Sequence, residues 1–172
     1  MKSKRWLDVV EYNAFADRFD AETDRAAAVL AGGFLDGFLE QVLRSVFFVE
    51  YKRNDELFEG NGPLRSFGNK IALAFALGTA TESVRRDLDL VRKVRNHFAH
   101  HLFEASFALP PVAQWCTALG AGTEESAELR VALQGYTPRQ RYLFAVATAM
   151  LRLAQSPRIA DDVRRRITRI ES

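Results

Sequence analysis

Apolar residues recur at intervals of three and four positions along most of this chain, the spacing that brings side chains to one face of an α-helix. No segment shows the alternation of apolar and polar residues that is typical of a half-buried strand. The chain has 172 residues, of which 48% are apolar and 27% charged, so it can bury a sizeable core. Its composition differs from that of a disordered protein. The sequence therefore predicts an all-α fold, a single-domain helical bundle of about six to seven helices over residues 1–172.

Capping residues and turn signals bound the expected helices. They cover about 6–19, 23–52, 67–77, 81–102, a short stretch around Trp115, 137–155, and a last helix after Pro157. The second is the longest, and its apolar stripe consists of Leu30, Phe34, Phe38, Val42, Val46 and Val49. Gly33 and Gly37 lie one turn apart on this helix. Because paired glycines weaken an isolated helix, they predict the close approach of another helix.

Charge and cysteine content exclude several protein classes. A formal net charge of +2 argues against a histone-like binder that relies on bulk charge. The single cysteine, Cys116, excludes intramolecular disulfides and cysteine-based zinc sites, and beside Trp115 it is interpreted as a buried apolar residue. The longest weakly polar stretch, residues 26–35, is too short to cross a bilayer, and no apolar run of signal-peptide length follows Met1. We therefore expect a soluble cytoplasmic protein with no membrane association and no cofactor.

The segment 87–101 holds all three histidines of the protein. On a helix, Arg92, Asn96 and His100 line up on one face, where Asn96 could orient the imidazole and Arg92 could hold an anion. A basic last turn also suits the helix dipole without any further role. His97, His100 and His101, with Glu104 one turn on, lack a firm three-ligand motif, so no metal site is predicted.

Arg95 falls within the apolar row of the same helix, which consists of Val84, Leu88, Val91, Phe98 and Leu102. A guanidinium in that position needs a carboxylate or phosphate partner, because an unpaired buried charge is costly. Asp24, Asp36 and Glu40 of the second helix are the candidates. The sequence thus predicts a structural ion pair between Arg95 and one of these carboxylates.

The residues Arg95-Asn96-x-x-x-His100 resemble the Arg-x4-His signature of HEPN-type domains, small helical units that often act as dimeric, metal-independent ribonucleases. The resemblance implies that Arg95 steadies the phosphate and His100 assists proton transfer, with Asn96 beside them. On an ideal helix Arg95 and His100 lie about 140° apart, so a shared site needs a helix end, a distortion or a second subunit.

A broader resemblance covers about residues 20–101. Its four blocks are Glu22-Thr23-Asp24-Arg25, Leu57-Phe58-Glu59-Gly60-Asn61-Gly62-Pro63-Leu64, Lys70-Ile71-x-Leu73-Ala74-x-Ala76-Leu77-Gly78 and Asp87-Leu88-x-Leu90-Val91-Arg92-Lys93-Val94-Arg95-Asn96-x-Phe98-Ala99-His100. In this order they resemble the mannitol operon repressor (MltR-type) family. The resemblance implies an all-helical bacterial transcriptional regulator, named for repression of mannitol uptake genes, without an obvious DNA-reading motif.

The best candidate for nucleic-acid contact is the basic face of the last helix, formed by Arg164, Arg165, Arg166 and Arg169. The alternative is a solvated helix face. Taken together, the sequence favours a non-enzymatic regulator that forms a homodimer and acts through a protein partner or DNA. A HEPN-like endoribonuclease that uses Arg95, Asn96 and His100, or a non-catalytic interaction module, are the alternative functions.

Overall fold

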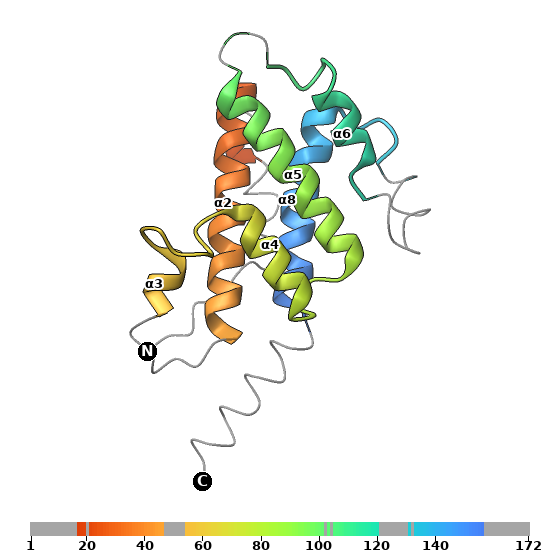
Figure 1. Cartoon of the computed structure of the whole chain (residues 1–172). Coiled ribbons are helices and arrows are strands. Elements are labelled where there is room, and N and C mark those ends of the chain that lie inside the picture. Colours follow the sequence, from red (N-terminus) through yellow and green to blue (C-terminus); the bar gives the residue numbers. More distant parts are fainter. Residues whose placement is uncertain are drawn as a thin grey trace.

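The computed structural model describes residues 17–19, 21–46, 54–101, 103, 105–120, 131 and 133–156. All regular secondary structure in these ranges is helical, which confirms the prediction of an all-α fold. The helices with defined bounds are α2 (Asp24–Val46), α3 (Asn54–Phe58), α4 (Phe67–Ala76), α5 (Glu82–His100), α6 (Val112–Ala118) and α8 (Pro138–Ala154) (Figure 1).

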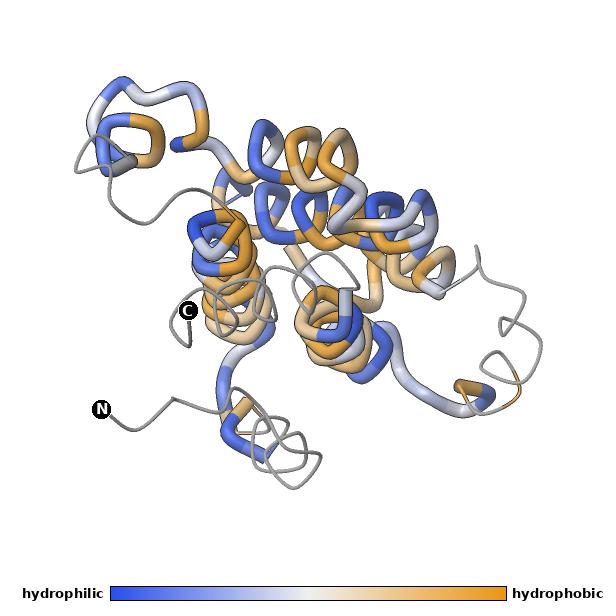
Figure 2. Tube along the Cα trace, turned by 90° about the horizontal axis from the view of Figure 1, so that it is seen from below, coloured by the Kyte–Doolittle hydropathy of each residue, from blue (hydrophilic) through white to orange (hydrophobic). Residues whose placement is uncertain are grey.

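The three long helices α2, α5 and α8 pack against one another and form the centre of the bundle (Figure 1). Helix α4 covers α2 and α5, while α6 packs on α5 and α8. Hydrophobic and hydrophilic residues alternate along the coils in Figure 2, so the long helices each carry an apolar side. These sides meet in one core, whose fully buried large side chains include Leu35, Leu39, Leu88, Val91, Phe98, Tyr142 and Met150.

Local capping interactions begin three of these helices where the sequence predicts. The hydroxyl of Ser66 accepts the amide of Asn69 at the start of α4, and Thr81 accepts the amide of Val84 at the start of α5. Thr137 and Gln140 form a reciprocal capping box before α8. Such caps satisfy amides that have no partner within the helix, and they depend on residues within three positions of one another.

The contact between α2 and its neighbours depends on Gly32. A β-carbon at Gly32 would lie 2.7 Å from the β-carbon of Arg95 and 2.8 Å from the hydroxyl of Tyr142. Gly33 and Gly37 are exposed, and a β-carbon at either would meet nothing within 4 Å in the described part of the chain. Among the described residues, the close approach predicted for these two glycines is made at Gly32, because one residue along a helix turns the side chain by about 100°.

The same rotation affects the predicted apolar stripe of α2. Leu30 and Phe34 are 55% and 50% exposed, whereas Ala31, Leu35 and Leu39 are fully buried. The core side of α2 thus follows a row adjacent to the predicted one, and the two rows converge at Phe38 and Val42, which are buried.

Helix α2 is the one described helix whose length and composition would allow it to cross a membrane. Half of its apolar window is buried inside the bundle, against α5 and α8. Its Asp36 and Glu40 both form ion pairs with Lys70 of α4. An apolar helix with these contacts is a core helix of the bundle.

Two arginines tie distant parts of the chain together. Arg25 of α2 donates to the carbonyl oxygens of Phe98 and His101, at the end of α5 where carbonyl groups have no partner within the helix. Arg139 of α8 donates to the carbonyl oxygens of Phe19 and Glu22 before α2. These hydrogen bonds fix the ends of the three central helices relative to one another.

Candidate functional site

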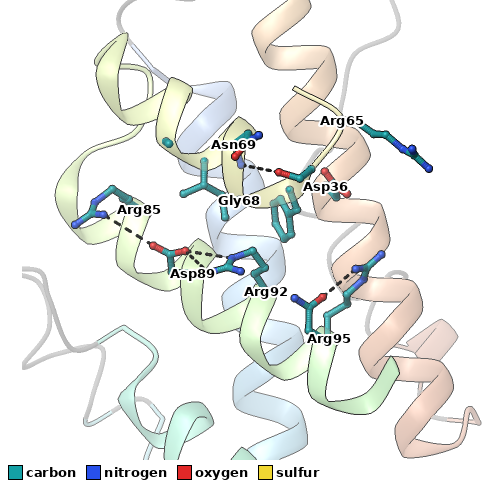
Figure 3. A pocket seen from close by; sticks show the side chains of 13 residues that line it. Asp36, Arg65, Gly68, Asn69, Arg85, Asp89, Arg92 and Arg95 are labelled. Carbon is teal, nitrogen blue, oxygen red and sulfur yellow. Dashed lines mark hydrogen bonds and ion pairs between the residues drawn. The ribbon is translucent and has the colours of Figure 1, made fainter. Parts of the chain in front are cut away.

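A cavity of about 550 Å³ lies where α4 faces α5, with one residue of α2 at its edge. Its charged lining consists of Arg65, Arg85, Arg92, Arg95, Asp36 and Asp89 (Figure 3). Four guanidinium groups thus face two carboxylates. Ser66, Gly68 and Asn69 bring the first turn of α4 to the same cavity. The site is built from three helices and one loop, so it exists only in the folded protein.

Three of the charged residues form a row along α5. Arg92 contacts Asp89 at 3.2 Å, and Arg85 reaches the other oxygen of Asp89 at 4.0 Å (Figure 3). Arg85 also pairs with Glu82 at 2.9 Å, which raises the pKa of Arg85 and lowers that of Glu82. These pairs are partly exposed and contribute little to stability. Their effect is to hold two guanidinium groups along one face of α5.

Arg95 does not form the predicted ion pair. Its Nη1 donates to Oδ1 of Asn96 at 2.9 Å, and its Nε is buried without a hydrogen-bond partner among the described residues. The side chain is half-buried, because its stem packs on Gly32 while the residue also lines the cavity. Tertiary packing therefore places Arg95 beside an amide, where sequence reasoning predicted a carboxylate.

The three candidate carboxylates pair with other cations. Asp24 contacts Arg139 at 3.1 Å, while Asp36 and Glu40 each contact Nζ of Lys70 at 2.8 Å. This corrects the predicted ion pair with Arg95. The physical reason is that α4 inserts its lysine, 5% exposed, directly between the two carboxylates of α2, which satisfies them.

Lys70 is the residue that sequence reasoning missed. The sequence contained a signal for it, because Lys70 is the one charged residue between Phe67 and Leu77, in a mostly apolar helix. Burial opposes ionisation of Glu40, but the hydrogen bonds from Lys70 and Arg44 outweigh it and hold the pKa of Glu40 below its usual value. The network joins α4 to α2 beside the cavity.

The three residues Arg92, Asn96 and His100, predicted to share one face of the helix, do not all lie at the same site. Arg92 and Asn96 line the cavity, whereas His100 is exposed and lies outside its lining. The rings of His97 and His101 stack at 4.1 Å, and burial together with His101 lowers the pKa of His97. The described residues contain no group of three or more His, Cys, Asp or Glu side chains that could hold a metal ion.

Some residues singled out in the sequence lie outside the described ranges. They are Val49, Leu102, Glu104, Arg164, Arg165, Arg166 and Arg169. The expected helix after Pro157 and most of the expected helix over residues 6–19 also lie outside these ranges. Cys116 is described and fully buried, and burial raises the pKa of its thiol to about 12. A thiol with that pKa remains protonated at neutral pH, which confirms its interpretation as an apolar core residue.

The fold is similar to that of MtlR. In the X-ray structure of the MtlR–HPr complex from Escherichia coli, the matching chain superposes with a TM-score of 0.64, over 84% of this chain and 98% of that chain, at 17% sequence identity. No protein-family model matches this chain, and no curated protein sequence matches it.

The likeness to MtlR concerns the fold. It supports the helical architecture that the resemblance of residues 20–101 to the mannitol operon repressor family implies. It extends over nearly the whole MtlR chain in that complex.

Proposed function

We propose that this protein is a bacterial transcriptional regulator that acts through protein contacts, as a homodimer in the cytoplasm. The observation that carries the proposal is the fold shared with 98% of an MtlR chain determined in complex with HPr. A protein partner of the HPr kind is therefore the first candidate for this chain. The four sequence blocks that resemble the mannitol operon repressor family support the same function.

The geometry of the segment 87–101 supports a non-enzymatic role. Its best proton-transfer group, His100, is exposed and does not line the cavity that holds Arg92, Arg95 and Asn96. Arg95 is bonded to Asn96, and its stem is confined by Gly32. The arginines therefore hold charge in place without a histidine in the described lining of the cavity.

Calorimetry with the HPr protein of the same bacterium tests the proposal. We expect saturable binding, and we expect deletion of the gene to raise transcription of the mannitol uptake genes. A matched bacterial protein of similar size and charge serves as the control for non-specific association. The proposal would be refuted if HPr did not bind and the transcript level did not change. A sedimentation coefficient of a monomer in analytical ultracentrifugation would refute the proposed homodimer.

A second candidate function is a HEPN-like, metal-independent endoribonuclease. The observation that favours it is that Arg95 and Asn96 line an arginine-rich cavity, in which a phosphate would meet several guanidinium groups. On this hypothesis His100 of the same or another subunit must reach the cavity during the reaction. RNA cleavage assays with the wild type and with His100→Ala separate the two functions.

A further inference from the structure

The cavity between α4 and α5 has an excess of positive charge that the described residues do not neutralise. Of its two carboxylates, Asp36 is held by Lys70 and Asp89 by Arg92. Arg65 donates to the carbonyl oxygen of Gly60 at 3.1 Å, and Arg95 donates to the neutral amide of Asn96. Within the described residues, Arg65 and Arg95 thus have no carboxylate partner.

The buried Nε of Arg95 strengthens this point. It has no hydrogen-bond partner in the described part of the chain. A buried donor without an acceptor is unfavourable, and one attached to a charged group more so. Arg95 also lines the cavity, so an anion that enters would lie beside this charged group, and the charge of the lining would favour its entry.

Backbone groups of α4 add further donors. Ser66 accepts the amide of Asn69, and the amides of Phe67 and Gly68, in the first turn of this ten-residue helix, have no acceptor within the helix. The positive end of the helix dipole lies at the same place. Arg92 lies beside it, since a β-carbon at Gly68 would be 3.7 Å from Nε of Arg92.

Size and polarity narrow the class of ligand. A volume of about 550 Å³ suits a small organic molecule, since such sites commonly span about 300–1,000 Å³. Phe67, Ile71 and Ala72 give part of the lining an apolar character. A phosphate group offers three acceptor oxygens and pairs with guanidinium groups through two parallel hydrogen bonds.

We propose that this cavity binds a small phosphate monoester, with the phosphate held by Arg92, Arg95 and the first turn of α4, and the organic part against Phe67. Arg65, on the exposed loop before α4, adds a further positive charge to the lining of the cavity. The proposal is independent of the regulator function, because a ligand site can be present or absent whichever partner the protein has.

Nuclear magnetic resonance titration of the full chain at constant ionic strength tests the proposal, with phenyl phosphate and inorganic phosphate as probes. We expect phenyl phosphate to shift the backbone amide of Gly68 and the Nε resonances of Arg92 and Arg95. We expect it to bind more tightly than inorganic phosphate. Absence of these shifts at millimolar probe would overturn the proposal. Equal affinity of the two probes would overturn the proposal that the ligand is a monoester, and would indicate a site for free phosphate.

Substitutions distinguish binding in the cavity from non-specific attraction of the probe to the positive charge of the protein. Arg92→Gln should weaken binding of phenyl phosphate by about tenfold or more, the effect of losing one charge-assisted hydrogen bond. Arg65→Gln, in an exposed loop, should weaken it without affecting folding, which keeps the test valid if Arg92→Gln unfolds. Arg86→Gln removes the same charge from an exposed position of α5 outside the cavity and should leave binding unchanged. Equal weakening by all three would overturn the proposal.

Discussion

A β-carbon built on Gly32 of α2 would lie only 2.7 Å from the β-carbon of Arg95 on α5. The backbone of one central helix is therefore in direct contact with the side-chain stem of the other. The hydroxyl of Tyr142 lies 2.8 Å from the same point and donates to the carbonyl oxygen of Ala28. This three-helix contact positions the base of Arg95, and with it one side of the arginine-lined cavity.

Gly32→Ala should destabilise the protein by about 1–3 kcal/mol, because the added methyl group overpacks a site where both Arg95 and Tyr142 are confined. Gly33→Ala is the matched control. It is one residue away, exposed and in the same helix, so it should instead stabilise by about 0.5–1 kcal/mol through helix propensity. Urea denaturation measures both. Equal effects of the two substitutions would contradict the packing described here.

Lys70→Met should destabilise the fold by leaving Asp36 and Glu40 without their shared cation. We expect about 2–3 kcal/mol, below the ~3–5 kcal/mol of a fully buried pair, because the carboxylates remain 20% and 26% exposed. Arg85→Gln, which removes a more exposed cation, should leave the melting temperature nearly unchanged. A Lys70→Met protein as stable as the wild type would exclude a structural role for this ion pair.

The same substitution should change the response to acid. The pKa of Glu40 is lower in the folded protein than its ordinary value of 4.5. Its contribution to stability is therefore complete above pH 4.5 and lost as the pH falls through the folded pKa. We expect Lys70→Met to flatten this acid-side loss. Parallel pH profiles of wild type and variant would show that another group is responsible.

Asp87 should make the stability of the protein depend on pH in the direction opposite to that of Glu40. Burial raises its pKa above the ordinary value of 3.8, and the hydrogen bond from the amide of Gly120, 3.0 Å long, offsets this only in part. The folded protein thus holds this proton to higher pH than the unfolded chain, so stability falls as the pH rises from 3.8 through the folded pKa. Asp87→Asn keeps an acceptor for Gly120 and should remove this decrease. Glu59→Gln, at an exposed position, is the control and should not. An unaltered profile in Asp87→Asn would contradict the assignment.

Purified protein should not cleave RNA above the level of a mock preparation, with or without a chelator. The reason is that His100 does not line the cavity that holds Arg95 and Asn96. If cleavage is present and His100→Ala reduces it by about 100-fold or more without unfolding the protein, the ribonuclease function replaces the regulator. Cleavage that survives the substitution would indicate a contaminant or another site.

Affinity for DNA, where present, should depend on Arg164, Arg165 and Arg166. Each lost phosphate contact should lower the slope of log affinity against log salt by about one. A gel-shift titration at several salt concentrations measures this for the triple alanine variant. A slope equal to that of the wild type would show that these arginines form a solvated face.

Sequence patterns predicted the starts of α4, α5 and α8 because these starts depend on neighbouring residues, whereas the short helix α3 was not predicted. Ser66 with Asn69, Thr81 with Val84, and Thr137 with Gln140 are each within three positions. A cap of this kind joins two groups within one turn, so the local sequence is enough to predict where it lies. The helical class and the starts of α4, α5 and α8 were accordingly determined by the sequence alone.

The pairing of side chains across helices was decided by tertiary structure. Whether Gly32 or Gly33 faces α5 depends on a rotation of one residue, and apolar residues on both rows of α2 leave that rotation open to sequence reasoning. The choice of Lys70 over Arg95 as partner of Asp36 and Glu40 depends on how α4 crosses α2, 30 or more residues away along the chain. The amino-acid sequence therefore specified the elements and the residues able to carry charge. Their arrangement into an arginine-lined cavity arose only when packing brought α4 and α5 together, because electrostatic partners are set by distance in space.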